Sequence, residues 1–261
     1  RLILPPSPRH SFFLWGPRQT GKTSLLRSTY PTARRIDLLE TDLFARYASQ
    51  PHRLREELLA NPEPFVVIDE IQKVPALLDE VHWLIENKRL QFILCGSSAR
   101  KLVRGKANLL GGRAWRFEMF PLVTAELKNP DLLAILNRGL IPAHYLQETF
   151  KKSLNAYTRD YLKEEVFDEG LTRNIPAFSR FFDAMGYSHG ELTNFSNIAR
   201  ECGVDSKTVK EYYQILVDTL LGNFVEPFKK RQERKVISRA SKFYLFDTGV
   251  AGSITKRNIE E

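Results

Sequence analysis

The sequence is poor in cysteine and has no long apolar run. Only two cysteines occur in 261 residues, Cys95 and Cys202, and they lie far apart without the spacing of metal ligands. This excludes a disulfide framework and a cysteine metal centre, and it favours buried free thiols in a reducing cytoplasm. The longest apolar runs are too short to cross a bilayer, and the N-terminus lacks the layout of a signal peptide. We therefore expect a cytoplasmic protein without a membrane partner.

The composition is that of a folded globular protein. Hydrophobic residues make up 43% of the chain and charged residues 27%, which excludes a disordered chain. The length is sufficient for two compact domains of ordinary size. The formal net charge of +8 permits an acidic partner such as nucleic acid but does not demonstrate one.

Residues 16–23 read Gly-Pro-Arg-Gln-Thr-Gly-Lys-Thr, which fits the Walker A or P-loop pattern G-x-x-x-x-G-K-[ST]. An apolar run precedes it, as a buried strand should, and a helical pattern follows it. Glycines let the loop approach a phosphate, and free N–H groups at the helix N-terminus face the anion. We expect Lys22 between the β- and γ-phosphates and the Thr23 hydroxyl on Mg²⁺. The expected nucleotide-binding residues are Gly16, Pro17, Arg18, Gln19, Thr20, Gly21, Lys22, Thr23 and Ser24.

A second motif follows at residues 65–70, Phe-Val-Val-Ile-Asp-Glu. Four apolar residues that end in two acids fit a Walker B pattern, because ligands of a parallel sheet collect at the carboxyl ends of its buried strands. Asp69 is expected to hold Mg²⁺, and Glu70 to polarise the attacking water as general base. The second carboxylate favours hydrolysis over binding alone, since a magnesium site does not need it.

Two further residues are candidates for contact with the γ-phosphate. Ser97 lies at the tip of an expected strand over 91–95 and is predicted to be a polar sensor of the phosphate or the attacking water. The neighbouring Ser98 is an alternative polar group that could equally cap the next helix. Arg113 follows a cluster of basic residues and is predicted to stabilise charge on the γ-phosphate or on the nucleotide of a neighbouring subunit.

The rest of the chain is expected to be helical and to end in a helix-turn-helix. We predict a P-loop ATPase domain over 1–128, a helical connector or lid over 129–190, and a winged helix-turn-helix over 191–261. Basic residues on its second helix and wing loop would neutralise DNA phosphates, although such domains also pack on the ATPase core or on protein partners. The candidate DNA contacts are Lys207, Lys210, Lys229, Lys230 and Arg231.

With these motifs in view, the chain resembles prokaryotic AAA+-type P-loop ATPases that carry a fused domain of unknown function. The resemblance covers nearly the whole chain and rests on the Walker A run, on Ile-Asp-Glu-Ile-Gln-Lys-Val-Pro at 68–75, and on Lys-Phe-Tyr-Leu-Phe-Asp-Thr-Gly-Val at 242–250. It implies an α/β fold of the AAA+/ASCE type, with a parallel sheet flanked by helices. It also implies a further, restriction-endonuclease-like domain that begins soon after residue 250 and is truncated in this sequence.

The expected function is Mg²⁺-dependent ATP binding and hydrolysis that drives a conformational switch, coupled to DNA or to a protein partner. A neighbouring copy of the chain or another partner would supply any missing arginine. One alternative is a nucleotide-gated DNA-binding regulator without significant turnover. Another is a P-loop kinase, against which the Asp69–Glu70 pair argues. The absence of an Asn-Lys-x-Asp run favours ATP over GTP.

Overall fold

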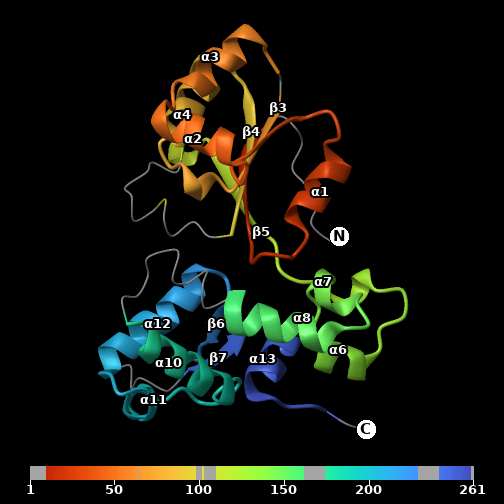
Figure 1. Ribbon diagram of the computed structural model, residues 1–261, viewed down its shortest axis with the longest axis vertical. Helices are drawn as coiled ribbons and strands as arrows, with labels where there is room; N and C mark the ends of the chain where they lie inside the picture. The colour runs from red at the N-terminus through yellow and green to blue at the C-terminus, as the bar shows by residue number, and fades with distance from the viewer. Residues whose placement is uncertain are drawn as a thin grey trace. The chain divides into compact units, whose positions relative to one another are not determined.

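The computed structural model describes residues 10–63, 65–97, 102, 110–161, 174–228 and 241–259. The chain divides into two compact units, Arg1–Phe120 and Pro121–Glu261, and most of their longer elements are labelled in Figure 1. None of the helices in the described ranges is long and apolar enough to cross a membrane.

The first unit is built on a five-stranded sheet in the order β2-β3-β4-β1-β5. Every neighbouring pair of strands is parallel, so the predicted α/β class is confirmed. Since β4 lies between β1 and β3, the strand before the Walker A loop and the strand that carries the Walker B motif are not neighbours. The strands are β1 (Ser11–Trp15), β2 (Arg34–Asp37), β3 (Phe65–Asp69), β4 (Gln91–Gly96) and β5 (Ala114–Glu118).

Helices cover both faces of this sheet, which explains why its central strands are apolar throughout. Figure 1 shows α1 on one side of the sheet and α2, α3 and α4 on the other. Phe12 and Leu14 of β1 pack with Leu26 of α1, and by the alternation of a strand Phe13 and Trp15 point to the opposite face. The helices of this unit are α1 (Lys22–Thr29), α2 (Thr41–Ser49), α3 (Arg53–Ala60), η1 (Ile71–Lys73), α4 (Leu77–Lys88) and η2 (Leu110–Gly112).

The second unit is mostly helical and has one two-stranded antiparallel sheet, β6-β7. Its elements are η3 (Thr124–Glu126), α6 (Leu132–Arg138), α7 (Pro142–Tyr145), α8 (Phe150–Ala156), the π-helix η4 (Tyr157–Tyr161), α10 (Ile175–Tyr187), α11 (Phe195–Cys202), α12 (Ser206–Asp218), β6 (Gly222–Val225), β7 (Lys242–Leu245) and α13 (Thr248–Thr255).

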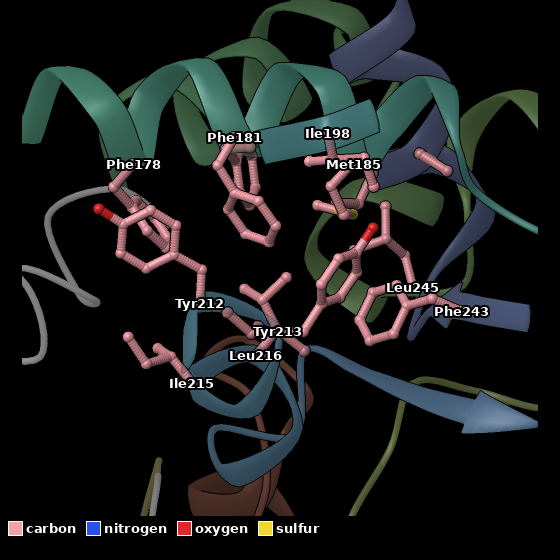
Figure 2. Packing of buried hydrophobic residues seen from close by; sticks show 14 of the residues in the cluster. Phe178, Phe181, Met185, Ile198, Tyr212, Tyr213, Ile215, Leu216, Phe243 and Leu245 are labelled. Carbon is pink, nitrogen blue, oxygen red and sulfur yellow. The ribbon is translucent and has the colours of Figure 1, made fainter. Parts of the chain in front are cut away.

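An aromatic cluster forms the core of the second unit. Figure 2 shows Phe178 and Phe181 of α10 facing Tyr212 and Tyr213 of α12, with Phe243 of β7 at the end of the cluster opposite Phe178. Ring centroids in these pairs lie about 5 Å apart, for example 4.9 Å between Phe181 and Tyr213, which is the range of favourable aromatic contacts. Elements on both sides of the expected boundary at 190/191 therefore share one core.

The segment that was expected to form a helix-turn-helix contains the helices α11 and α12. Asn194 caps α11 by accepting hydrogen bonds from two backbone N–H groups, and Gly203 ends it with a φ of 67°, a conformation that glycine adopts without strain. Asp205 caps α12 by accepting from the Thr208 N–H. Beyond α12, β6 pairs with β7, and Leu192 forms an additional antiparallel bridge to Lys242.

Candidate nucleotide site

The P-loop joins β1 to α1 at the carboxyl edge of the sheet, and the neighbouring backbone fixes its path. The Gly16 N–H donates to the Gly96 carbonyl over 3.3 Å, and a Cβ on Gly16 would lie 2.2 Å from the Met119 carbonyl oxygen. The loop then bends through two residues with positive φ, Gln19 at 62° and Gly21 at 91°. Such bends turn successive backbone N–H groups toward one point, which is the geometry of an anion-binding nest. The predicted strand–loop–helix context is thus present.

Lys22 is the buried cation of this loop. Its side chain is only 6% exposed, and its Nζ donates to the Gly16 and Pro17 carbonyl oxygens over 2.6 and 3.0 Å. A buried ammonium group requires such acceptors, because desolvation without them is costly. Phosphate oxygens are stronger acceptors for an ammonium than carbonyl oxygens are. The Lys22 ammonium group is therefore held at the loop by these carbonyl oxygens, in a position suited to bind an anion.

Thr23 and Asp69 lie 46 residues apart in sequence but are in direct contact. The Thr23 hydroxyl donates to Asp69 Oδ2 over 2.8 Å, so the start of α1 touches the end of β3. Adjacent oxygen ligands of an octahedral Mg²⁺ at 2.0–2.1 Å lie about 2.9 Å apart. A hydroxyl and a carboxylate are also the oxygen ligands that Mg²⁺ prefers. These two residues therefore fit a magnesium site.

Glu70 follows Asp69 in an unusual backbone conformation. Its φ is 55° and its ψ is 42°, a left-handed conformation that is strained for a residue with a Cβ. The side chain is 8% exposed. Burial raises the pKa of its carboxyl group, and the Asp69 charge adds to this, whereas the charges of Arg18 and Lys22 lower the pKa. A carboxyl group with a raised pKa is a better proton acceptor when ionised, as a general base requires.

The structure also brings in Gln72, for which sequence reasoning gave no role. Its Nε2 donates to Glu70 Oε2 over 2.5 Å and to Ser97 Oγ over 3.2 Å. Ser97 is 2% exposed at the end of β4, so the predicted sensor and the predicted base are joined through one amide. In the sequence, Gln72 is marked only by its place in the 68–75 run. A contact between residues i and i+2 across a bend follows neither the helical nor the strand periodicity, so a search for periodic patterns does not find it.

Arg113 does not join this site in its own chain. It precedes β5, whose first residue Ala114 pairs with Ser11 at the start of β1. The P-loop follows Trp15 at the other end of β1, and the Arg113 guanidinium forms an ion pair with Glu86. The parallel register therefore places Arg113 at the opposite edge of the sheet from the P-loop. Its alternative role toward a neighbouring subunit stays a prediction.

The candidate DNA contacts divide into two groups. Lys207 and Lys210 are exposed on α12, and Lys210 Nζ lies 5.4 Å from the centre of the Phe195 ring. Lys229, Lys230 and Arg231 fall outside the described residues.

A parallel sheet with a P-loop after one strand and an acid pair after another defines a P-loop nucleotide-binding protein. Comparison with protein families agrees, because a family described as an AAA domain matches residues 8–128. A second family, described as a domain of unknown function (DUF8612), matches residues 129–261. The chain therefore belongs to the family of this domain of unknown function, and an AAA domain of the P-loop nucleotide-binding type precedes that domain.

The chain is also similar to uncharacterized proteins of Mycobacterium bovis and Mycobacterium tuberculosis. Each is 25% identical to it over 248 residues, which cover 91% of this chain and 54% of the relative. The chain thus spans about half the length of the relatives it matches.

Proposed function

We propose that the chain hydrolyses ATP in a Mg²⁺-dependent reaction and that Glu70 is the general base. The observation that carries this proposal is the 2.8 Å contact between Thr23 and Asp69, next to a buried carboxylate whose pKa burial raises. The Thr23 hydroxyl and an Asp69 carboxylate oxygen could both bind Mg²⁺, and the adjacent Glu70 carboxylate could accept a proton from a water molecule. Nucleotide binding alone would not require both.

In this proposal each side chain has one task. Lys22 exchanges its contacts with loop carbonyls for β- and γ-phosphate oxygens and neutralises their charge. Thr23 and Asp69 would hold Mg²⁺, which when bound offsets the charge that develops on the phosphates. Glu70 Oε2 is engaged by Gln72, so the second carboxylate oxygen, Oε1, takes the proton of the attacking water. Ser97 contacts the γ-phosphate from the tip of β4.

Hydrolysis would also work as a switch. The γ-phosphate is the group that Lys22 and Ser97 contact together, and these residues belong to two different segments of the first unit. Loss of that phosphate removes the differential binding energy that favours the ATP-bound conformation. We propose that the second unit passes this change to a partner.

The decisive experiment measures phosphate release from ATP and Mg²⁺ by wild type, Glu70→Gln and the control Glu56→Gln. Glu56 is exposed on α3, so its substitution makes the same chemical change away from the site. We expect Glu70→Gln to lose turnover by about 10²-fold or more, with the ATP dissociation constant changed by less than about 3-fold. Normal turnover in Glu70→Gln would remove it from the role of base. Transfer to an added acceptor, without free phosphate, would instead favour the kinase alternative.

A second candidate function is nucleic-acid binding by the second unit. The order α10, the Leu192 bridge, α11, α12 and the β6-β7 pair supports a winged helix, in which α12 would be the recognition helix. The lysines Lys207 and Lys210 are exposed on that helix. This arrangement favours contact with the phosphates of duplex DNA, gated by the nucleotide state.

This candidate is tested by titrating a labelled DNA duplex at several salt concentrations. Each lysine that contacts a phosphate contributes about 0.9 to the slope of log K against log salt. We expect the double variant Lys207→Ala with Lys210→Ala to reduce the slope by about 1–2. The charge-matched control, Lys151→Ala with Lys152→Ala, changes two exposed lysines of α8 and should leave it unchanged. Equal slopes for the two double variants would exclude α12 as the contact.

A further inference from the structure

Gln72 is a buried polar side chain between two residues of the candidate site. It is 5% exposed and belongs to the short helix η1, which begins directly after Glu70. The left-handed bend at Glu70 reverses the chain, and the Lys73 N–H donates to the Glu70 carbonyl over 2.9 Å. This tight turn brings the side chains of residues 70 and 72 to the same edge of the sheet. The strained backbone at Glu70 thus creates the contact with Gln72.

The amide of Gln72 can have only one orientation here. An amide nitrogen carries two hydrogens, and Nε2 uses both, one toward Glu70 Oε2 and one toward Ser97 Oγ. A flipped amide would place its oxygen against the carboxylate and repel it. In the observed orientation Oε1 is buried, and it has no hydrogen-bond partner among the described residues. Burying an acceptor without a partner costs free energy, a cost that core packing alone does not explain.

Space for this amide depends on Gly96. A Cβ at Gly96 would lie 2.2 Å from Gln72 Oε1 and 2.6 Å from the Trp15 ring. The last residue of β4 must therefore be glycine for Gln72 to reach Ser97, the residue that follows it.

We infer that Gln72 is a positioning residue that couples Glu70 to Ser97, so that the phosphate sensor and the base act together. This inference rests on the proposed function. Because Ser97 Oγ accepts a hydrogen bond from Gln72, its own hydroxyl proton is free to be donated to a phosphate oxygen. Because Glu70 Oε2 is held by the same amide, Oε1 is directed to the water. A shift of Ser97 toward the γ-phosphate therefore moves the base through a shared donor.

The test replaces Gln72 with methionine, which keeps the length and volume of the side chain and removes both N–H donors. We expect Gln72→Met to lower kcat by about 10- to 100-fold and to change the ATP dissociation constant by less than about 3-fold. Loss of the donor also raises the pKa of Glu70, so the acid limb of the pH–rate profile should move to higher pH. The control is Gln214→Met at an exposed position of α12, where Gln214 makes the same kind of contact, to Asp218 over 2.6 Å.

Ser97→Ala supplies the second arm of the test. If Gln72 acts through Ser97, the double variant loses clearly less than the product of the two single losses. If Gln72 has only a structural role, Gln72→Met should keep the turnover and the pH profile of wild type. Wild-type turnover or an unshifted pH profile in Gln72→Met would each overturn the inference. The tryptophan fluorescence of the first unit, which includes Trp15 against Gly96, reports whether the variant is folded.

A direct measurement separates this inference from the proposed function. If wild type releases no phosphate, the proposed function fails, and the carbon-13 carboxyl resonance of Glu70 is then compared at one pH with and without Ser97→Ala. A resonance that moves with Ser97→Ala in the wild-type background but not in Gln72→Met supports the coupling through Gln72. A resonance that Ser97→Ala leaves unchanged in both backgrounds refutes it.

Discussion

Among the described residues, each unit of the molecule buries one carboxylate, and the surroundings of the two carboxylates differ. Glu70 is 8% exposed and Asp247 is 5% exposed, and burial raises the pKa of both carboxyl groups. The partners of Glu70 are a side-chain amide and the charges of Arg18 and Lys22. Asp247 instead accepts from two backbone N–H groups, those of Leu140 at 2.6 Å and Val250 at 3.0 Å. Burial and a raised pKa therefore do not by themselves identify a catalytic carboxylate.

The hydrogen-bond donors to each carboxylate distinguish a structural role for Asp247 from the proposed catalytic role of Glu70. The backbone donors of Asp247 come from two segments 110 residues apart, the turn after α6 and the first turn of α13, so this carboxylate fastens one segment to the other. Gly139 leaves room for it, because a Cβ there would lie 1.9 Å from Asp247 Oδ1. Backbone donors cannot leave without unfolding the segment that carries them. The partners of Glu70 are side chains that can rearrange, and its backbone is strained, as functional sites often are.

The largest effect is expected from Asp247→Ala, which leaves two buried N–H groups without an acceptor. We expect the second unit to lose about 2–4 kcal/mol of unfolding free energy, measured by circular dichroism in urea. All three tryptophans lie in the first unit, so the fluorescence transition should not move. Asp131→Ala, which removes an exposed helix cap, serves as the comparison and should cost about 1 kcal/mol. Equal losses would show that burial of Asp247 is irrelevant.

Glu70→Gly sharpens the comparison from the other side. Glycine relieves the left-handed strain but adds freedom to the unfolded chain, and these terms nearly cancel. We expect the fluorescence-detected stability of the first unit to stay within about 1 kcal/mol of wild type, while phosphate release is lost. A destabilisation as large as that of Asp247→Ala would make Glu70 a structural residue.

The pH dependence of the two carboxyl groups should have different consequences. The proposed base Glu70 could accept a proton only when ionised, so turnover should fall with acidification at a midpoint above the ordinary glutamate pKa of about 4.3. A midpoint at or below that value would contradict the effect of burial.

For Asp247 the sign follows from proton uptake. Its raised pKa means that the folded state binds more protons than the unfolded state between the two pKa values. The stability of the second unit, relative to Asp247→Asn, should therefore fall as pH rises from the unfolded aspartate pKa through the raised pKa, and then level off. A rise over that interval would mean that the backbone donors outweigh desolvation.

The smallest effect is expected from Arg113→Ala. Its ion pair with Glu86 is solvent-exposed, and its strand end lies away from the P-loop, so ATP affinity in dilute protein should not change measurably. Turnover that falls only at high protein concentration would assign Arg113 to a neighbouring subunit's nucleotide. Weaker ATP binding by the isolated chain would contradict its position at the opposite edge.

The sequence by itself determined the class of fold and the residues of the two Walker motifs. Apolar runs marked β1 and β3, and the Walker motifs named Lys22, Thr23, Asp69 and Glu70, because these features depend on residues that are adjacent in the chain. The N-cap of α12 is equally local, since Asp205 accepts from a donor three residues away.

Only the tertiary structure decided which side chains meet. Gln72 contacts Ser97 across 25 residues, and Asp247 contacts Leu140 across 107. Arg113 lies away from the P-loop because β5 runs parallel to β1. Such contacts depend on strand order, register and packing, which are properties of the whole chain. No local pattern carries them, because the energies that select among long-range pairings arise only when the elements pack.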